Sequence, residues 1–227
     1  MNADGPQVRK NLVLLACILG SGIAFLDATV VNVALPAIRA DLHAGLSVQQ
    51  WVVEAYLLTL GSLLLIGGSL GDIFGRRRVF MLGVAAFGAT SAMCALAPSA
   101  GFLIGARALQ GIAGALLVPS TMALIVATFD ESERGRAIGS WTAWTGIATV
   151  IGPLAGGALV QAASWRWVFL INLPFAALTL TLMARAIPRG ADALPEVRPR
   201  VDVRGALLAA FGLAGPVFAL IQQPVYG

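Results

Sequence analysis

Charged side chains are scarce in this sequence of 227 residues. Asp, Glu, Lys and Arg make up only 11% of it, whereas 58% is hydrophobic and the mean hydropathy is +0.85. A soluble domain carries about 25% charged residues, which cover its surface. The scarcity of charge therefore excludes an ordinary soluble fold and indicates a chain that lies in a lipid bilayer.

Histidine and cysteine are also rare. The sequence has one histidine, His43, and two cysteines, Cys17 and Cys94, which fall in different apolar stretches, so it predicts neither a disulfide nor a metal site. It contains no nucleophile–base set and no phosphate-binding loop, which argues against an enzyme and against a bound cofactor. The basic residues lie in short loops between apolar stretches, so we expect no nucleic-acid partner.

Long apolar runs dominate the chain. Crossing the hydrocarbon core takes roughly 20 mainly apolar residues in a helix. Arg9 and Lys10 precede the first run as in a signal peptide, but the run is too long and more runs follow, so we interpret it as a retained first helix. The sequence predicts an all-α, polytopic membrane helix bundle. Its seven expected spans are Leu12–Pro36, Gln50–Leu70, Val79–Ala97, Phe102–Phe129, Ala137–Ala163, Val168–Ile187 and Gly205–Gln222.

The basic residues predict the orientation of these spans. Positively charged loops face the cytoplasm. If the N-terminus is inside, twelve basic residues face the cytoplasm against two outside, Arg39 and Arg166. We therefore expect a multi-pass protein of a bacterial cytoplasmic membrane with its N-terminus inside. The twelve are Arg9, Lys10, Arg76, Arg77, Arg78, Arg134, Arg136, Arg185, Arg189, Arg198, Arg200 and Arg204.

The expected spans divide the chain into three parts. Residues 1–187 hold six helices, and residues 188–204 form a linker on the cytoplasmic side that is rich in proline and charge. Residues 205–227 hold a seventh helix and its outer end. An odd number of spans places the two ends of the chain on opposite sides of the membrane.

The stretch GGSLGDIFGRRRVF, residues 67–80, places one acidic and three basic side chains between two apolar runs. It can be a simple anchor, for which any three cytoplasmic arginines would serve. It can also be a clamp in which Asp72, at a helix end, pairs with an arginine in one conformation only, while Gly71 and Gly75 allow a tight turn. Physical chemistry alone leaves both interpretations open.

Several stretches carry a resemblance to one family. GSLGDIFGRRR resembles the G-x-L-x-D-x-x-G-R-R loop between helices two and three of the major facilitator superfamily. LDATVVNVALPAI, RALQGIAGALLVPS, GPLAGG and SWRWVFLINLPFA resemble, in chain order, stretches of helices one, four, five and six in its fourteen-helix drug:proton antiporter branch. The positions that match the loop motif are Gly68, Leu70, Asp72, Gly75, Arg76 and Arg77.

The resemblance implies a transporter with two six-helix halves and two extra helices between them. This chain then corresponds to the N-terminal half plus a seventh helix, and its partner is the missing C-terminal half, without which we expect no transport. The fifth-helix motif implies export. We therefore expect proton-coupled export of amphipathic drugs or small metabolites across the lipid bilayer, with Asp72, Arg76 and Arg77 forming a gating loop.

Two charges are expected inside the membrane at the centre of this function. Asp27 lies deep in the first span, where an acid usually marks an ion or substrate path, so it is a candidate proton carrier; a structural, hydrogen-bonded Asp is the alternative. Arg107 cannot lose its proton and needs a counter-charge, and Gln110 shares its helix face. We expect Arg107 to exchange carboxylate for backbone partners as the proton moves, or else to form a permanent pair that holds two helices together.

Glu54 departs from the family pattern, which more often has threonine at this place. It is either a substrate-selecting acid or an interfacial residue about one turn inside the membrane.

The fifth span is rich in small residues. They serve either close helix packing or, at a bend, a seal against proton leak. The residues of this expected antiporter motif are Gly146, Gly152, Pro153, Gly156 and Gly157.

Two other functions are compatible with the sequence. A solute:proton symporter of the same fold would keep the loop motif but import its substrate. A truncated helix bundle that does not transport would need a partner chain to supply the missing helices.

Overall fold

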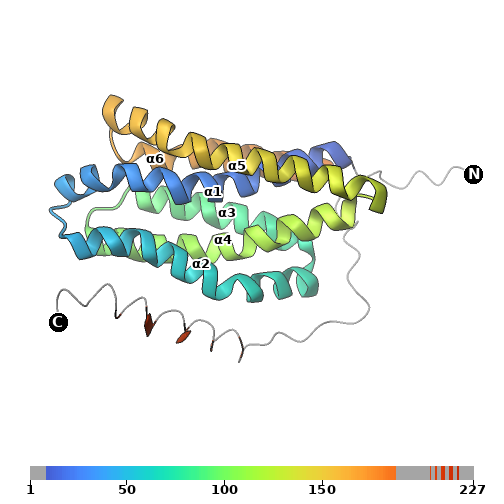
Figure 1. The fold of residues 1–227 in the computed structure, drawn as a ribbon, viewed down its shortest axis with the longest axis horizontal. Helices are drawn as coiled ribbons and strands as arrows, with labels where there is room; N and C mark the ends of the chain where they lie inside the picture. The colour runs from blue at the N-terminus through green and yellow to red at the C-terminus, as the bar shows by residue number, and fades with distance from the viewer. Residues whose placement is uncertain are drawn as a thin grey trace, which may run out of the picture.

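The computed structural model describes residues 9–187 without a break and, beyond them, only residues 205, 208, 211, 212, 215, 216 and 219. The expected linker at 188–204 lies outside the described residues, as does most of the expected seventh helix. Residues 9–187 form an elongated bundle of helices without a strand (Figure 1). The predicted all-α fold is confirmed.

Six helical segments of the described chain are long and apolar enough to cross a membrane. Their connections are short, so consecutive spans run in opposite directions along the bundle (Figure 1). The sixth span is made of two helices, α6 and α7. The bounds are α1 Lys10–Asp41, α2 Leu46–Phe74, α3 Arg76–Ala95, α4 Ala100–Thr128, α5 Glu131–Ala162, α6 Trp167–Leu170 and α7 Asn172–Ala186.

Most helices extend beyond the apolar runs that predict them. α2 begins at Leu46 instead of Gln50, and α5 begins at Glu131 instead of Ala137. A helix satisfies its own backbone hydrogen bonds, so it can continue past the apolar stretch into water. Hydropathy therefore locates a span but underestimates the length of its helix.

The sixth span consists of two helical segments that meet at Ile171, where the backbone stays helical with a φ of −57° and a ψ of −27°. Pro174 has no backbone N–H to donate to the carbonyl of Leu170, so one hydrogen bond of the helix is missing there. α7 begins at the next residue, Asn172, with Pro174 in its first turn. Asn172 lies inside the bundle.

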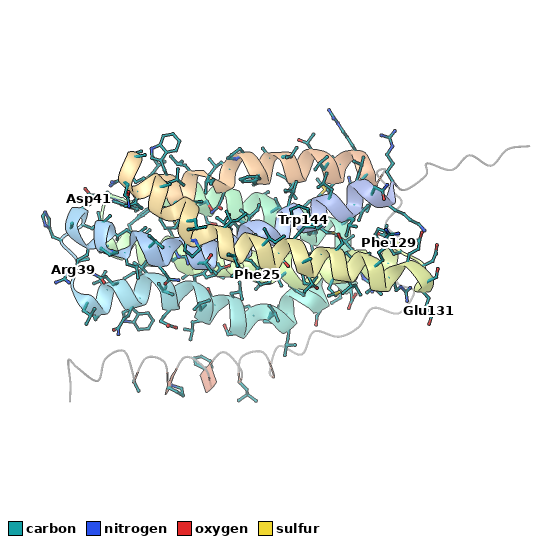
Figure 2. All side chains as sticks on the ribbon, turned by 45° about the horizontal axis from the view of Figure 1, so that its top comes forward. Phe25, Arg39, Asp41, Phe129, Glu131 and Trp144 are labelled. Carbon is teal, nitrogen blue, oxygen red and sulfur yellow. The ribbon has the colours of Figure 1, made fainter. Side chains whose placement is uncertain are left out.

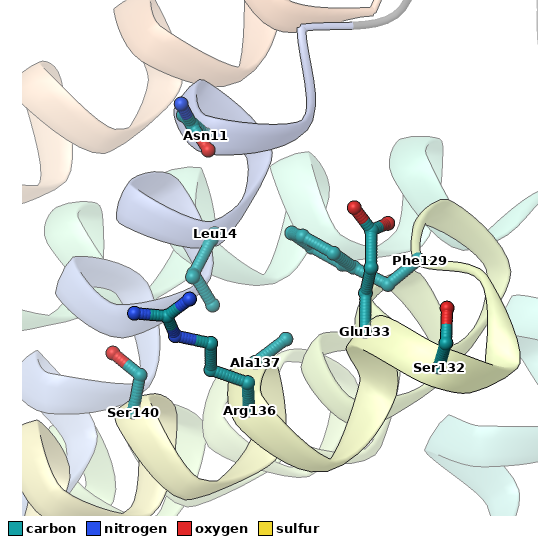
Figure 3. A pocket seen from close by; sticks show the side chains of 8 residues that line it. All are labelled: Asn11, Leu14, Phe129, Ser132, Glu133, Arg136, Ala137 and Ser140. Atoms are coloured by element: carbon teal, nitrogen blue, oxygen red, sulfur yellow. The ribbon is translucent and has the colours of Figure 1, made fainter.

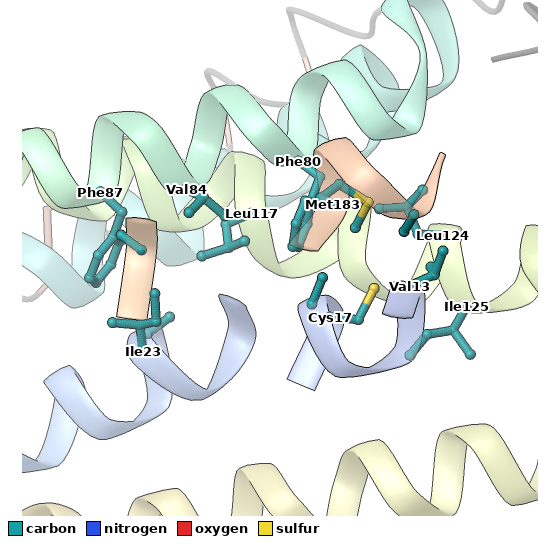
Figure 4. Close-up of a cluster of buried hydrophobic side chains, with 14 of the residues drawn as sticks. Val13, Cys17, Ile23, Phe80, Val84, Phe87, Leu117, Leu124, Ile125 and Met183 are labelled. Atoms are coloured by element: carbon teal, nitrogen blue, oxygen red, sulfur yellow. The ribbon is translucent and has the colours of Figure 1, made fainter. Parts of the chain in front are cut away.

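α1 lies inside the bundle, where it packs against α4, α5 and α7. Val13 and Cys17 of α1 are fully buried in an apolar cluster that includes Phe80 of α3, Ile125 of α4 and Met183 of α7 (Figure 4). This cluster joins α1, α3, α4 and α7 through apolar packing and without strong hydrogen bonds. α2 and α3, by contrast, pack mainly against α4.

Ion pairs join the helices at both ends of the bundle. At one end, Lys10 Nζ lies 2.7 Å from Asp130 Oδ2 and 2.6 Å from Glu133 Oε2, which links the start of α1 to the start of α5. The hydrogen bond from Lys10 lowers the pKa of the Asp130 carboxyl. At the opposite end, Arg166 Nη1 lies 2.7 Å from Asp41 Oδ2. Figure 2 shows Asp41 and Glu131 at these two ends.

Candidate functional site

Asp27 and Arg107 form an ion pair inside the bundle. Asp27 lies near the middle of α1 and is 0% exposed, and Arg107 of α4 is 1% exposed. Arg107 Nη1 donates a hydrogen bond to Asp27 Oδ2. An ion pair so completely removed from water is stable only when the remaining polar atoms of both groups are also bonded.

Arg107 has further partners besides the carboxylate. Its Nε donates to the carbonyl of Val52 at 3.0 Å, and Nη1 also donates to Gln110 Oε1 at 2.7 Å. The guanidinium lies 4.3 Å from the centre of the Tyr56 ring, within cation–π range. Arg107 therefore keeps two acceptors and an aromatic face when its contact with Asp27 is broken.

The second oxygen of Asp27 is held by two amides. Gln110 Nε2 donates to Asp27 Oδ1 at 3.1 Å, and Asn172 Nδ2 donates to the same oxygen at 2.9 Å. Both amides also donate to Ser91 Oγ, at 2.8 Å and 3.1 Å. Four spans thus meet at one carboxylate: α1, α3, α4 and the sixth.

Sequence reasoning finds part of this cluster. It selects Asp27, Arg107 and Gln110, and the structure brings these three together. It misses Ser91 and Asn172. Asn172 stands out only as a polar residue in the apolar run VFLINLPFA, and a serine in a membrane helix carries no comparable signal.

Glu54 lies apart from this cluster. It is half-buried on α2, and no described residue forms an ion pair with it. Arg107 takes Asp27 as its acid instead. Within the described chain, Glu54 is therefore not the ion-pair partner of Arg107.

The turn between α2 and α3 holds the expected gating residues. Gly75 has a φ of 97°, a left-handed conformation that glycine adopts without strain, and it separates the two helices. Asp72 Oδ1 lies 3.1 Å from Arg76 Nη2, and Arg76 Nη1 donates to the carbonyl of Ala123 on α4 at 3.3 Å. Arg77 is only 8% exposed and its Nε has no partner in the described chain, and the ion pair found for Asp72 is with Arg76.

Gly68 lies one turn before this loop. A Cβ at Gly68 would lie 3.6 Å from the Pro119 side chain, an ordinary contact, so the space around it does not require glycine.

Two of the five motif residues on α5 contact α1. A Cβ at Gly152 would lie 2.1 Å from Thr29 Oγ1, and a Cβ at Gly156 would lie 2.7 Å from the Val30 side chain. Only glycine allows this approach of the two helices. A Cβ at Gly146 would meet nothing within 4 Å, and one at Gly157 would make an ordinary contact at 3.8 Å.

Another face of α5 is left open by the described chain. Val150 is 70% exposed and Leu154 is 73% exposed, and Pro153 is exposed between them. Trp144 on the same helix is also exposed, at 56% (Figure 2). α5 thus uses one face for α1 and presents apolar side chains on the other.

A cavity of about 410 Å³ opens at the end of the bundle that holds the Lys10 ion pairs (Figure 3). Arg136 and Glu133 both line it, together with Asn11 and Ser132. Its charges are of opposite sign and close together. It therefore shows no net preference for an anion or a cation.

Six membrane-length helices in the described chain and a buried, hydrogen-bonded ion pair among them define a polytopic membrane protein with a polar site in its interior. A profile of the Major Facilitator Superfamily matches residues 17–224, and the chain belongs to this superfamily of transporters. The expected family is confirmed, and its members transport solutes instead of catalysing reactions.

Several relatives with similar sequences are named as resistance or export proteins. The chain is 42% identical to the puromycin resistance protein of Streptomyces alboniger, over 96% of this chain and 43% of the relative. It is 40% identical to the tetracenomycin C resistance and export protein of Streptomyces glaucescens, over 99% of this chain and 41% of the relative. The chain thus spans about two fifths of the length of these relatives.

Solved structures show the same fold. A peptide transporter, POT, in complex with sulfate superimposes with a TM-score of 0.73 over 98% of this chain and 48% of that chain, at 15% identity. At this identity the likeness concerns the fold alone. The chain is a multi-pass membrane protein whose fold matches one half of a major facilitator transporter.

Proposed function

We propose that this chain forms one half of an exporter that moves small amphipathic molecules out of the cell in exchange for protons. The observation that carries the proposal is the buried ion pair between Asp27 and Arg107. Intramembrane acids with a nearby base usually mark ion or substrate paths. The names of the relatives, which are resistance and export proteins, favour export over uptake.

In this mechanism Asp27 carries the proton. A proton on Asp27 cancels the charge that Arg107 faces, which weakens the contact between α1 and α4. Arg107 then relies on Val52 O and Gln110 Oε1, which it already contacts. The Arg107 guanidinium keeps hydrogen-bond acceptors whether Asp27 is protonated or ionised, so the pair can alternate between the two protonation states of Asp27.

The remaining motif residues act at the ends and edges of the half. Asp72 and Arg76 latch the α2–α3 turn to α4 through Ala123 O, in one conformation of the transporter. The open face of α5 docks against the second half of the whole protein and seals it. The N-terminus lies in the cytoplasm, on the side of the arginine-rich loops.

The test is efflux of ethidium, a fluorescent amphipathic cation, from cells that carry the full-length transporter. We expect efflux that a protonophore abolishes, and that falls at least tenfold in Asp27→Asn. This variant keeps the size of the side chain but cannot exchange a proton. Asp41→Asn is the matched control, because Asp41 lies on the same helix but at its exposed end.

Efflux that is unchanged in Asp27→Asn at matched expression would remove Asp27 from proton coupling. Uptake instead of efflux down the same proton gradient would identify a symporter. If Asp41→Asn lowers efflux as much as Asp27→Asn, the loss reflects general damage to α1 and the assignment of the proton site fails.

A further inference from the structure

Two cavities lie along the contact between α1 and α5. The larger, of about 410 Å³, is the one at the Lys10 end of the bundle, and a smaller one, of about 230 Å³, lies deeper, between α1, α5 and the start of α7. On α1 the larger cavity reaches Leu14 and the smaller begins at Ile18. On α5 they reach Ser140 and begin at Trp144. Each of these pairs is one helical turn apart on one face, so the second cavity continues the first toward the middle of the membrane.

The two cavities together make up an α1–α5 groove whose polarity changes along its length. At the Lys10 end its lining includes the charged residues Glu133 and Arg136, whereas the deeper part is apolar apart from the buried Asn172. From Leu14 to Leu26 the groove follows about 18 Å of helix rise. This length is comparable to half of the roughly 30 Å hydrocarbon core. A charged head followed by an apolar part of one leaflet's depth matches the shape of a phospholipid.

Both charges at the head of the groove have bonding capacity left. Arg136 is exposed, and within the described chain it forms no ion pair and no hydrogen bond. Figure 3 shows its guanidinium extending from α5 toward α1. Glu133 receives Lys10 on Oε2 at 2.6 Å, and no described residue donates to its Oε1. Lys10 is also shared with Asp130, so one lysine serves two carboxylates.

Arg136 and Glu133 do not pair with each other, although residues three apart on a helix are neighbours. Glu133 turns to Lys10 instead, and no ion pair joins it to Arg136 in the described chain. The head of the groove therefore offers one cation and one anion side by side. An occupant that carries one charge of each sign on adjacent groups can satisfy both, which a simple anion or cation cannot do.

We infer that the α1–α5 groove binds one molecule of a zwitterionic phospholipid with a primary ammonium group, namely phosphatidylethanolamine. Its phosphate contacts Arg136, its ammonium donates to Glu133 Oε1, and one acyl chain lies along the apolar part. Arginine binds phosphate through two parallel N–H bonds, and the hydroxyl groups of Ser132 and Ser140 line the same cavity as further donors.

Other occupants satisfy fewer of these groups. Phosphatidylcholine carries the same charges, but its quaternary ammonium has no N–H to donate to Glu133. Phosphatidylglycerol has no cation and brings a net negative charge next to that carboxylate. A zwitterion without acyl chains would leave the apolar part of the groove unfilled. With the N-terminus in the cytoplasm, as proposed above, the bound lipid belongs to the inner leaflet.

The test is native mass spectrometry of the purified, delipidated full-length transporter with one added lipid at a time. The three probes are the dioleoyl forms of phosphatidylethanolamine, phosphatidylcholine and phosphatidylglycerol, which share their acyl chains and differ in the headgroup. We expect one phosphatidylethanolamine to bind about fivefold more tightly than either of the others, the effect of one charged contact at a membrane surface.

Two variants change the headgroup preference in different directions. Arg136→Gln removes the contact with the phosphate, which all three lipids share, so it should weaken all of them about fivefold. Glu133→Gln leaves an acceptor for Lys10 but no negative charge. It should abolish the preference for phosphatidylethanolamine and strengthen the binding of phosphatidylglycerol. Arg78→Gln is the matched control, because Arg78 is exposed at the start of α3 and lines neither cavity.

Gly22→Val tests the apolar part of the groove. Gly22 lines the deeper cavity, and a Cβ there would meet only the Ala148 Cβ, at 4.0 Å. We expect this variant to weaken dioleoyl phosphatidylethanolamine but not the dihexanoyl form, whose chains are too short to reach it. Gly61→Val is its control, since a Cβ at Gly61 on α2 meets nothing within 4 Å and Gly61 is exposed.

Three results would overturn the inference: equal binding of the three dioleoyl lipids, a preference that survives in Glu133→Gln, or no saturable lipid binding to the wild type. The last is expected if the second half of the transporter covers the groove. Equal losses in Arg136→Gln and Arg78→Gln would also remove Arg136 from the site. The assay needs neither a proton gradient nor transport, so its failure is separate from a failure of the Asp27 efflux test.

Discussion

At the scale of single residues, the buried polar cluster shows how far one side chain predicts another. Asp27 and Arg107 are costly in a membrane, and each needs a partner of opposite charge, so the sequence alone suggests that they meet. Gln110 can also be predicted as a member of the cluster, because it lies on the same face of α4 as Arg107. The sequence does not predict that Ser91 and Asn172 belong to the cluster. A neutral polar side chain in a membrane helix can form a hydrogen bond with its own backbone and needs no distant partner.

The ion pair predicts a specific pattern of stability. Arg107→Met leaves the Asp27 carboxylate buried without its counter-charge, and we expect it to lower the free energy of unfolding by about 3–5 kcal/mol. The double variant Asp27→Asn/Arg107→Met removes both charges and should be more stable than Arg107→Met alone. Thermal unfolding of the full-length protein in detergent measures both.

Arg166→Met is the control for this series. Arg166 also pairs with an aspartate, but its side chain is 36% exposed and that of Asp41 is 47% exposed. We expect a change of less than about 1 kcal/mol, as for other surface pairs. A double variant less stable than Arg107→Met would show that the two charges do not depend on each other.

At the scale of the helices, the packing of α2 on α4 depends on glycines that no sequence motif selects. A Cβ at Gly67 would lie 1.8 Å from the carbonyl oxygen of Ala115. A Cβ at Gly111 would lie 2.0 Å from Thr59 Oγ1 and 2.3 Å from the carbonyl oxygen of Tyr56. The backbones of α2 and α4 therefore touch, as small residues allow in membrane helices.

Gly111→Ala is expected to destabilise the protein by about 1–3 kcal/mol, because the added methyl group forces α2 away from α4. Gly105→Ala on the same helix is the matched control: its Cβ would meet nothing within 4 Å. There the gain in helix propensity, up to about 1 kcal/mol, should leave the stability equal or higher. The measurement is the apparent melting temperature of each variant. An equal decrease in Gly111→Ala and Gly105→Ala would contradict the close packing of α2 on α4.

At the scale of the whole molecule, the ends of the bundle differ in charge. The starts of α3 and α5 carry arginines at one end, and the α1–α2 loop lies at the other (Figure 1). This distribution agrees with the orientation expected from the positive-inside rule. Cys17 and Cys94 are both 0% exposed, so an introduced surface cysteine can report the orientation with little background.

We expect Ser132→Cys to react with a membrane-impermeant maleimide only in inside-out vesicles, since Ser132 is exposed near the start of α5. Gly45→Cys, in the exposed loop before α2, should react only in intact cells. The unaltered chain serves as the blank. Labelling of Ser132→Cys in intact cells would reverse the proposed topology.

The sequence by itself determined the class of the protein. Continuous apolar runs of about 20 residues form helices in a bilayer, because only a helix satisfies its backbone hydrogen bonds within one segment there. The motifs were enough to predict the superfamily, and the few buried charges were enough to select Asp27 and Arg107. These properties are local in the chain, which is why no tertiary structure was needed to find them.

Only the tertiary structure decided which residues meet. It placed Asn172 of the sixth span against Asp27 of the first. It left Glu54 outside the charged cluster and Arg77 without Asp72 as a partner. Such contacts depend on the rotation and crossing of helices far apart in sequence, and hydropathy contains no information about either.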